Sequence, residues 1–183
     1  MPGETRRFIV AGVSGAGKTT LARRMSRVSG IPHVEIDSLF HGPGWTPREA
    51  FLDDVRALIA RESWITEWQY SSARSLLAER AQVLVWVDLP FLTVTLPRLV
   101  RRTLRRRFAG EELWNGNVEP PLHTFFTDRE HIVRWAWATR KMYRTRVPQV
   151  HAELEHLTVV HLRSRSDVER WLRRNWPRAG GPA

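Results

Sequence analysis

Three glycines, a lysine and two threonines gather in the stretch Gly12-Val-Ser-Gly-Ala-Gly-Lys-Thr-Thr20. Their spacing fits the pattern G-x-x-x-x-G-K-[ST], which places Gly12 and Gly17 ahead of Lys18 and Thr19. A phosphate chain needs a ring of backbone N–H donors, and glycines line such a ring because side chains would block the approach. The lysine can reach the outer phosphates, and the threonine hydroxyl can ligate Mg²⁺. The motif therefore predicts a nucleotide-binding site.

The segments on both sides of this loop are of the kind that a phosphate site needs. Arg7–Ala11 reads as a buried strand, and Lys18–Ser29 reads as an amphipathic helix with its apolar side chains on one face. The positive end of that helix adds to the attraction for an anion. A chance glycine-rich turn would rarely have both flanks. The residues predicted to contact the phosphate chain are Gly12, Val13, Ser14, Gly15, Ala16, Gly17, Lys18, Thr19 and Thr20.

Three carboxylates come at the ends of short apolar runs. They are Asp37, Glu67 and Asp88. Ligands of open parallel sheets bind at the carboxyl ends of the strands, so these side chains are candidates for the site. Asp37 can orient an acceptor hydroxyl or take its proton, with a turn-capping role as the alternative. Either Glu67 or Asp88 can join Thr19 in holding the metal.

Residues 98–107 carry six arginines and no acidic residue. Such a helix repels itself unless an anion is near, because no i, i+4 ion pairs are available to it. Phosphoryl transfer needs cations, since its transition state spreads negative charge over the equatorial oxygens. We predict that Arg102 and Arg106 are catalytic and belong to a helical, arginine-rich lid at about residues 101–146. Binding to a nucleic-acid backbone is the alternative for this segment.

The composition fits one globular domain. The chain has 183 residues, which suits a single P-loop domain over residues 1–177 with a flexible tail at 178–183. It has no cysteine, which excludes disulfides and thiolate metal sites. No apolar run is long enough for a membrane span, and no apolar signal core follows the N-terminus, so a cytoplasmic protein without membrane contact is expected. The net charge of +10 favours anionic partners.

Strands alternating with helices predict a three-layer α/β fold, in which a parallel sheet has helices on both faces. Two helix boundaries follow from prolines. Thr46-Pro47 is expected to begin one helix, and Pro148 is expected to end another that starts near Asp128. Five strands are predicted, at residues 7–11, 33–36, 63–67, 83–87 and 157–162.

Several stretches of the chain together resemble a known group. They are GVSGAGKTTLARR, IDSLFHGPGW, WITEWQYSSAR, VWVDLP and ELWNGN, spread over about residues 7–175. The sequence resembles the P-loop kinases related to adenylate kinase, and within them the small bacterial proteins of the topology-modulation type. The resemblance implies a five-stranded parallel sheet in the order 2-3-1-4-5, ATP with Mg²⁺, and a mobile lid. It also favours Glu67 over Asp88 as the metal carboxylate, although that group usually has Asp-Gly-Asn-Tyr where this chain has Glu67-Trp-Gln-Tyr70.

The expected function is that of an ATP-dependent kinase that transfers the γ-phosphoryl group to a small acceptor. A nucleotide, a nucleoside or a sugar-like hydroxyl would fit. Two alternatives stay open. One is a nucleic-acid-associated regulatory ATPase that grips the backbone through the arginine helix, and the other is a toxin-like kinase.

Overall fold

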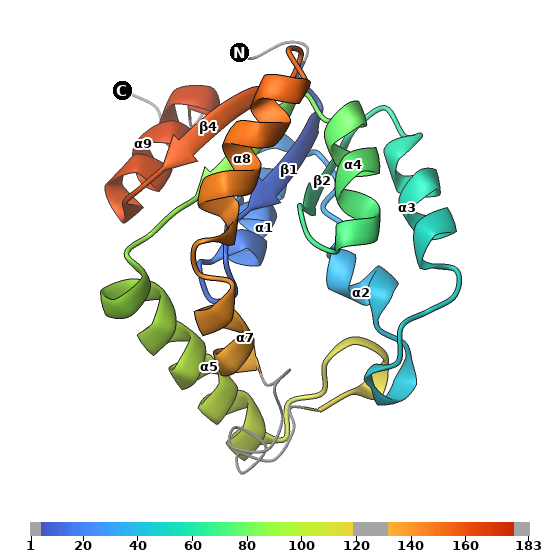
Figure 1. Cartoon of the computed structure of the whole chain (residues 1–183), viewed down its shortest axis with the longest axis vertical. Helices are drawn as coiled ribbons and strands as arrows, with labels where there is room; N and C mark the ends of the chain where they lie inside the picture. The colour runs from blue at the N-terminus through green and yellow to red at the C-terminus, as the bar shows by residue number, and fades with distance from the viewer. Residues whose placement is uncertain (1–4, 119–131, 178–183) are drawn as a thin grey trace, which may run out of the picture.

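A parallel sheet forms the centre of the protein. The computed structural model describes residues 5–118 and 132–177, and its strands are β1 (Arg7–Ala11), β2 (Trp64–Glu67), β3 (Val83–Val87) and β4 (Thr158–Leu162). They lie in the order β2-β1-β3-β4, all parallel (Figure 1). All five residues of β3 are buried, as expected of a strand covered on both faces.

The strand predicted at residues 33–36 is not formed. His33 makes a single parallel bridge to Ile65, and Val34 donates its N–H to the Ile65 carbonyl at 3.0 Å. Ile36 already begins helix α2 (Ile36–Phe40), and its N–H turns to a Glu67 carboxylate oxygen at 3.1 Å. The prediction of five strands was therefore wrong, because the amide that would extend the ladder binds a side chain instead. The four strands keep the relative order predicted for their segments.

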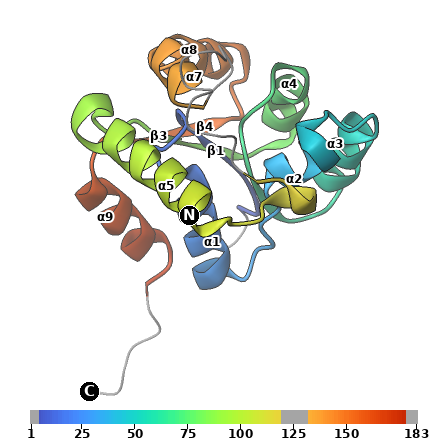
Figure 2. The same ribbon diagram turned by 90° about the horizontal axis from the view of Figure 1, so that it is seen from below.

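Helices α1 (Lys18–Ser29) and α9 (Arg165–Asn175) cover one face of the sheet, as Figure 2 shows. Phe8 and Val10 of β1 point to this face and share an apolar cluster with Leu21 of α1. Successive side chains of a strand point to opposite faces, so the residues between them belong to the other layer.

Three helices cover the opposite face. They are α3 (Phe51–Ile59), α4 (Ser71–Arg80) and α8 (Met142–Glu153). Ile9 and Ala11 of β1 are buried against this layer. The predicted three-layer arrangement with helices on both faces is confirmed.

A separate helical pair extends below the sheet in Figure 1. A π-helical turn, η2 (Phe91–Thr95), leads into α5 (Leu96–Ala109), which packs against α7 (Ile132–Ala138). Pro97 lies in the first turn of α5, which begins at Leu96, and a missing N–H costs little at that position. The predicted lid at 101–146 includes residues 119–131, which lie outside the described residues, as does the predicted tail at 178–183.

Two boundaries predicted from prolines differ in the structure. Helix α3 begins at Phe51, because residues 43–45 form a 3₁₀ turn and Arg48 donates its N–H back to the Phe40 carbonyl at 2.9 Å. Pro148 lies inside α8 and does not end it. The α8 positions around it, Val147 and Val150, are buried, and that burial outweighs a proline cost of about 3 kcal/mol.

No helix within residues 5–118 and 132–177 has both the length and the apolar character to cross a bilayer. The α5 helix has 14 residues, six of them arginine, whereas a crossing needs about 20 apolar residues.

Candidate functional site

The loop between β1 and α1 curls back on itself at the carboxyl end of the sheet. Ala16 donates its N–H to the Val13 carbonyl at 3.1 Å, and the Lys18 Nζ lies 3.3 Å from the same oxygen. Gly17 adopts a left-handed conformation with φ of 98° and precedes the first residue of α1. The backbone therefore has the curved, glycine-dependent shape that the phosphate-binding motif predicts.

The base of α5 packs directly on this loop. Gly15 has φ of +83°, and a Cβ at this position would lie 2.8 Å from the Leu99 Cβ and 2.9 Å from the Thr95 carbonyl oxygen. Both contacts are shorter than ordinary van der Waals distances, so only glycine fits. Of the other loop residues predicted from the motif, Ala16 is buried, Ser14 and Thr19 are half-buried, and Thr20 is exposed.

Gly15→Ala is expected to destabilise the protein and to weaken nucleotide binding. A suitable control is Gly30→Ala, because Gly30 also has a positive φ of +75° but has open space around its Cβ position. The control should lose about 1 kcal/mol from the left-handed conformation alone. Gly15→Ala should lose a further 1–3 kcal/mol, roughly the cost of overpacking. Chemical denaturation of both variants measures the difference, and equal losses would show that α5 does not press on the loop.

Lys18 is the cation at the centre of the site. It is 8% exposed. Burial is the main cause that lowers the pKa of Lys18 to about 8, and nearby Arg102 lowers it further, while Asp37 and Glu67 partly offset the shift. The structure thus brings together four of the predicted residues: Lys18, Asp37, Glu67 and Arg102.

ATP binding is expected to weaken as the pH rises past about 8. The pKa of Lys18, lowered to about 8 by burial, means that the free protein loses this positive charge over the range in which an ordinary lysine keeps it. A fluorescent ATP analogue titrated between pH 6.5 and 9.5 measures the effect. A constant affinity across that range would contradict a role for the Lys18 charge.

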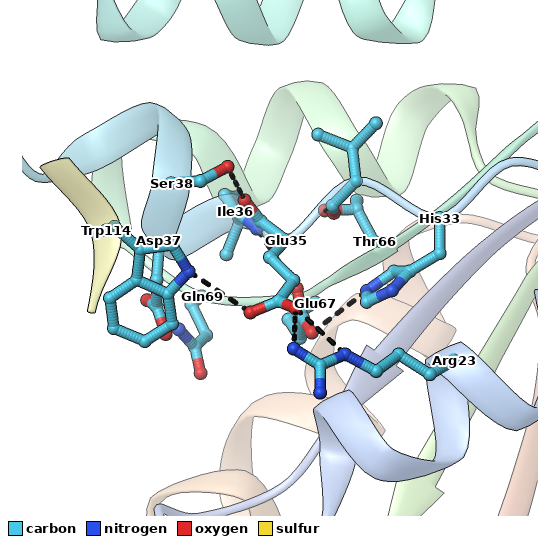
Figure 3. A network of polar contacts seen from close by, with 11 residues as sticks. Arg23, His33, Glu35, Ile36, Asp37, Ser38, Thr66, Glu67, Gln69 and Trp114 are labelled. Carbon is cyan, nitrogen blue, oxygen red and sulfur yellow. Dashed lines mark hydrogen bonds and ion pairs between the residues drawn. The ribbon is translucent and has the colours of Figure 1, made fainter. Parts of the chain in front are cut away.

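Glu67 is held in place by a set of donors. His33 Nε2 lies 3.2 Å from Oε1, and the Ile36 N–H donates to Oε2 at 3.1 Å (Figure 3). Burial alone would raise the pKa of Glu67, but the hydrogen bonds and charge from His33, the Ile36 amide and the Thr19 hydroxyl keep it below its ordinary value. Glu67 is therefore an ionised carboxylate in contact with Thr19, which is the arrangement expected of two magnesium-binding side chains.

Asp37 lies near Lys18 but in a different environment. Its Oδ1 accepts hydrogen bonds from Gln69 Nε2 at 2.8 Å and from the Tyr70 hydroxyl at 2.5 Å. Burial raises the pKa of Asp37 above its ordinary value, although Tyr70 and Lys18 oppose the shift. Two carboxylates near one lysine thus have pKa values shifted in opposite directions, a pattern typical of sites with divided acid–base roles.

Asp88 has different partners. Its Oδ2 lies 3.2 Å from His161 Nε2 on β4, and its Oδ1 lies 3.6 Å from an Arg144 nitrogen on α8. A small cavity beside it is lined by Val13 and Arg140 among others. The carboxylates whose charges raise the pKa of Lys18 are Asp37 and Glu67. Of the two metal candidates, Glu67 has the better placement.

With this geometry in place, comparison with known proteins identifies the fold. No family model and no curated protein matches the chain. A gluconokinase structure from Sinorhizobium meliloti 1021 aligns with a TM-score of 0.51 and 18% identity over 93% of this chain and 95% of its own. A shikimate kinase from Acinetobacter baumannii, in complex with shikimate, aligns with a TM-score of 0.50 and 16% identity over 93% and 92%.

The chain shares the fold of these two solved kinases. The prediction of an adenylate-kinase-like P-loop fold is confirmed at this level. The closer resemblance to proteins of the topology-modulation type stays a prediction.

The arginines of α5 differ in their distance from the P-loop. The guanidinium of Arg98 lies beside the P-loop, since a Cβ on Gly17 would lie 3.8 Å from one of its nitrogens. Arg102 lies one turn later, and its positive charge lowers the pKa of Lys18. Arg106 is further along the helix, with its Nε 3.4 Å from Glu111 Oε1. The sequence analysis singled out Arg102 and Arg106 as catalytic and included Arg98 only among the arginines of residues 98–107. The i, i+4 spacing places Arg98 on the same helix face as Arg102.

Sequence reasoning also missed the side chains that hold the two carboxylates. These side chains belong to His33, Gln69 and Tyr70. All three are polar residues at or next to the ends of predicted strands, and that position is the sequence feature that could have pointed to them. Within the described residues, no three His, Cys, Asp or Glu side chains cluster closely enough to hold a metal by themselves. A magnesium ion in kinase sites is commonly held by one or two protein groups together with the nucleotide phosphates.

Proposed function

We propose that this protein is an ATP-dependent kinase that transfers the γ-phosphoryl group of ATP to a hydroxyl group of a small molecule. The observation that carries the proposal is the position of buried Lys18 between the P-loop and two carboxylates with opposite pKa shifts. The shared fold with gluconokinase and shikimate kinase, both named for small hydroxylated acceptors, supports it. A cytoplasmic location fits, since ATP is supplied there.

The P-loop and α1 bind the nucleotide in this proposal. The amides of residues 12–19 and the Lys18 ammonium would hold the phosphate chain, and Thr19 with Glu67 would hold Mg²⁺. The glycine-lined loop, where a Cβ at Gly15 would clash, and the Thr19–Glu67 contact are the observations that fit these ligands. Bound magnesium would offset charge on the phosphates.

Asp37 prepares the acceptor. Tyr70 and Gln69 both donate to its Oδ1, which leaves Oδ2 to accept from an acceptor hydroxyl in this proposal. The raised pKa of Asp37, caused first by burial, makes it a stronger base than an exposed aspartate. It would accept the hydroxyl proton as the acceptor oxygen bonds to the γ-phosphorus and the bond from that phosphorus to the bridging oxygen breaks, which releases ADP. Arg98 and Arg102 would offset negative charge that develops on the transferred group.

The exposed arginines of α5 favour one second candidate, nucleic-acid binding. Arg98, Arg101, Arg105 and Arg107 are all exposed on one helix. A salt titration separates the two functions, because backbone binding weakens steeply with salt. Tight duplex binding that falls sharply between 50 and 200 mM salt would favour the nucleic-acid function.

A direct test measures ADP release from ATP with a panel of hydroxylated compounds. The panel contains gluconate, shikimate, nucleosides and neutral sugars, and the Lys18→Ala variant is the control. We expect one chemical class to raise ADP release well above the rate with water alone, and only in the parent protein. If no compound does so while the fluorescent ATP analogue binds, the kinase proposal fails.

A further inference from the structure

The exposed apolar side chains of the protein gather on one part of the structure. Within the described residues, eight large apolar side chains are exposed, and six of them belong to η2, α5 and α7. The six are Leu92, Val100, Leu104, Phe108, Trp135 and Trp137. Their elements form the helical part that extends below the sheet (Figure 1). Apolar residues scattered singly over a surface are ordinary, whereas such a concentration is typical of a contact surface.

Three of these residues form a stripe along α5. Val100, Leu104 and Phe108 are spaced i, i+4 and i+8, so they lie one above another on one side of the helix. They are 37%, 37% and 78% exposed. The buried residues of α5, Leu99 and Thr103, point about 120° away from this apolar stripe. Leu99 packs on the P-loop at Gly15, so the stripe faces away from the nucleotide site.

Arginines flank the apolar stripe on both sides. Around the helix, exposed Arg101 and Arg105 lie on one side of the stripe and exposed Arg107 lies on the other. Arg105 shares the carboxylate of Glu111 with Arg106, at distances of 3.3 and 3.4 Å. One carboxylate thus faces two guanidinium groups, and α5 itself contains no acidic residue. The surface around the stripe therefore keeps a net positive charge.

An anionic lipid surface matches this arrangement of apolar and charged groups. A helix in a membrane interface buries an apolar side at the acyl boundary and places its cations at the level of the phosphates. The exposed Trp135 and Trp137 of α7, which packs against α5, are of the residue type that such interfaces favour. A strand of nucleic acid would leave the aliphatic stripe unused, because valine and leucine cannot stack on bases. Two copies of the stripe would bring like charges together, which opposes self-association.

We propose that the outer side of α5 is a contact surface for anionic lipid bilayers. The apolar stripe enters the interface, and Arg101, Arg105 and Arg107 lie at the lipid phosphates. Such a peripheral contact needs no membrane-spanning helix, and it departs from the expectation of a protein without membrane contact. Arg98 and Arg102 lie on the side of α5 nearer the P-loop and stay available to a nucleotide. The inference goes beyond the proposed function and does not depend on it.

Vesicle flotation tests the contact directly. The protein is mixed with vesicles of phosphatidylcholine, prepared with or without phosphatidylglycerol, at low and at high salt. We expect binding to the anionic vesicles only, and weaker binding as salt rises, because the attraction of arginines to a charged bilayer falls off within a Debye length. No binding to the anionic vesicles at low salt would overturn the proposal.

Two substitutions on α5 separate the apolar from the charged contribution. Phe108→Ser should weaken vesicle binding about tenfold, the loss expected when a phenyl ring no longer leaves water. Arg101→Gln should weaken it about fivefold, roughly the contribution of one arginine near an anionic surface. Helix α1 offers the matched controls Val28→Ser and Arg27→Gln, because both side chains are exposed on a different part of the protein. Equal effects on α1 and α5 would overturn the proposal.

A fluorescent label shows whether the stripe enters the bilayer, and it covers the case in which Phe108→Ser does not fold. The chain has no cysteine, so Leu104→Cys carries a single environment-sensitive dye, and Val28→Cys carries it in the control. With anionic vesicles, the emission should shift to the blue for the label on α5 and stay unchanged for the control. An unshifted emission from both labels would overturn the proposal. Tight DNA binding that Phe108→Ser leaves unchanged, without vesicle binding, would assign the surface to nucleic acid instead.

Discussion

Replacing Lys18 with alanine is expected to lower phosphoryl transfer by about 10²–10³-fold, the loss typical when a fixed charge-stabilising group is removed from a catalytic site. Lys18 is the buried cation that lies between the P-loop and both carboxylates. The attraction between the Lys18 ammonium and a phosphate would be strongest where water is excluded, because a low dielectric increases every electrostatic interaction. Turnover of ATP with the best compound from the acceptor panel measures the loss.

The fold should survive this change. The pKa of Lys18, lowered by burial, shows that the folded protein disfavours its charge, so an apolar side chain of similar length costs little stability. Lys18→Met is the matched variant, since it keeps the volume and removes only the ammonium. We expect both variants to unfold cooperatively within a few degrees of the parent. Full turnover in either variant would refute the assignment of the nucleotide site.

Asp37→Asn is expected to lower acceptor phosphorylation by about 10²–10⁴-fold while ATP affinity is kept. Asparagine preserves the shape of the side chain and can still accept hydrogen bonds from Tyr70 and Gln69. It cannot take the acceptor proton. Steady-state kinetics and binding of the ATP analogue measure the two properties, and retention of both activities would make Asp37 purely structural.

The same substitution is expected to stabilise the fold at pH 7 by about 1 kcal/mol. Burial raises the pKa of Asp37, so the ionised form is less favoured in the folded state than in the unfolded chain. Asp37 therefore supports the fold best below its unfolded pKa of about 4, and this support is lost as the pH rises through the raised folded value. The gain from Asp37→Asn should be present at pH 7 and absent near pH 3.

Glu67→Gln is the contrasting variant and should lose stability at pH 7, by about 1–3 kcal/mol. The pKa of Glu67 is lowered, because the donors around it outweigh the effect of burial, so its ionised form stabilises the fold above the unfolded value and this support is lost as the pH falls through the folded one. Thermal denaturation of the pair gives opposite signs if the two environments are as described. The same sign for both would contradict the divided roles of these carboxylates.

The sequence by itself determined the parts of the site that depend on a few neighbouring residues. The P-loop and the helix from Lys18 to Ser29 were predicted with their bounds, because glycine conformation and helix capping act within one turn of the backbone. The parallel sheet between helical layers followed from the alternation of apolar segments. The positions of Glu67 and Asp88 at strand ends followed from the same pattern, whereas Asp37, predicted at the end of a strand, lies in the first turn of α2.

Only the tertiary structure decided which of those groups meet. Gln69 and Tyr70 reach Asp37 across more than 30 residues of chain, and Asn117 reaches the Gly42 carbonyl across more than 70. Glu67 and Asp88 have equivalent places in the sequence pattern, and only the packing of β4 and α8 gives Asp88 other partners. The absence of a strand at residues 33–36 and the position of Pro148 inside α8 also depend on tertiary contacts. Local preferences of about 1–3 kcal/mol give way where a buried carboxylate or an apolar core gains more from a contact that no short stretch of sequence contains.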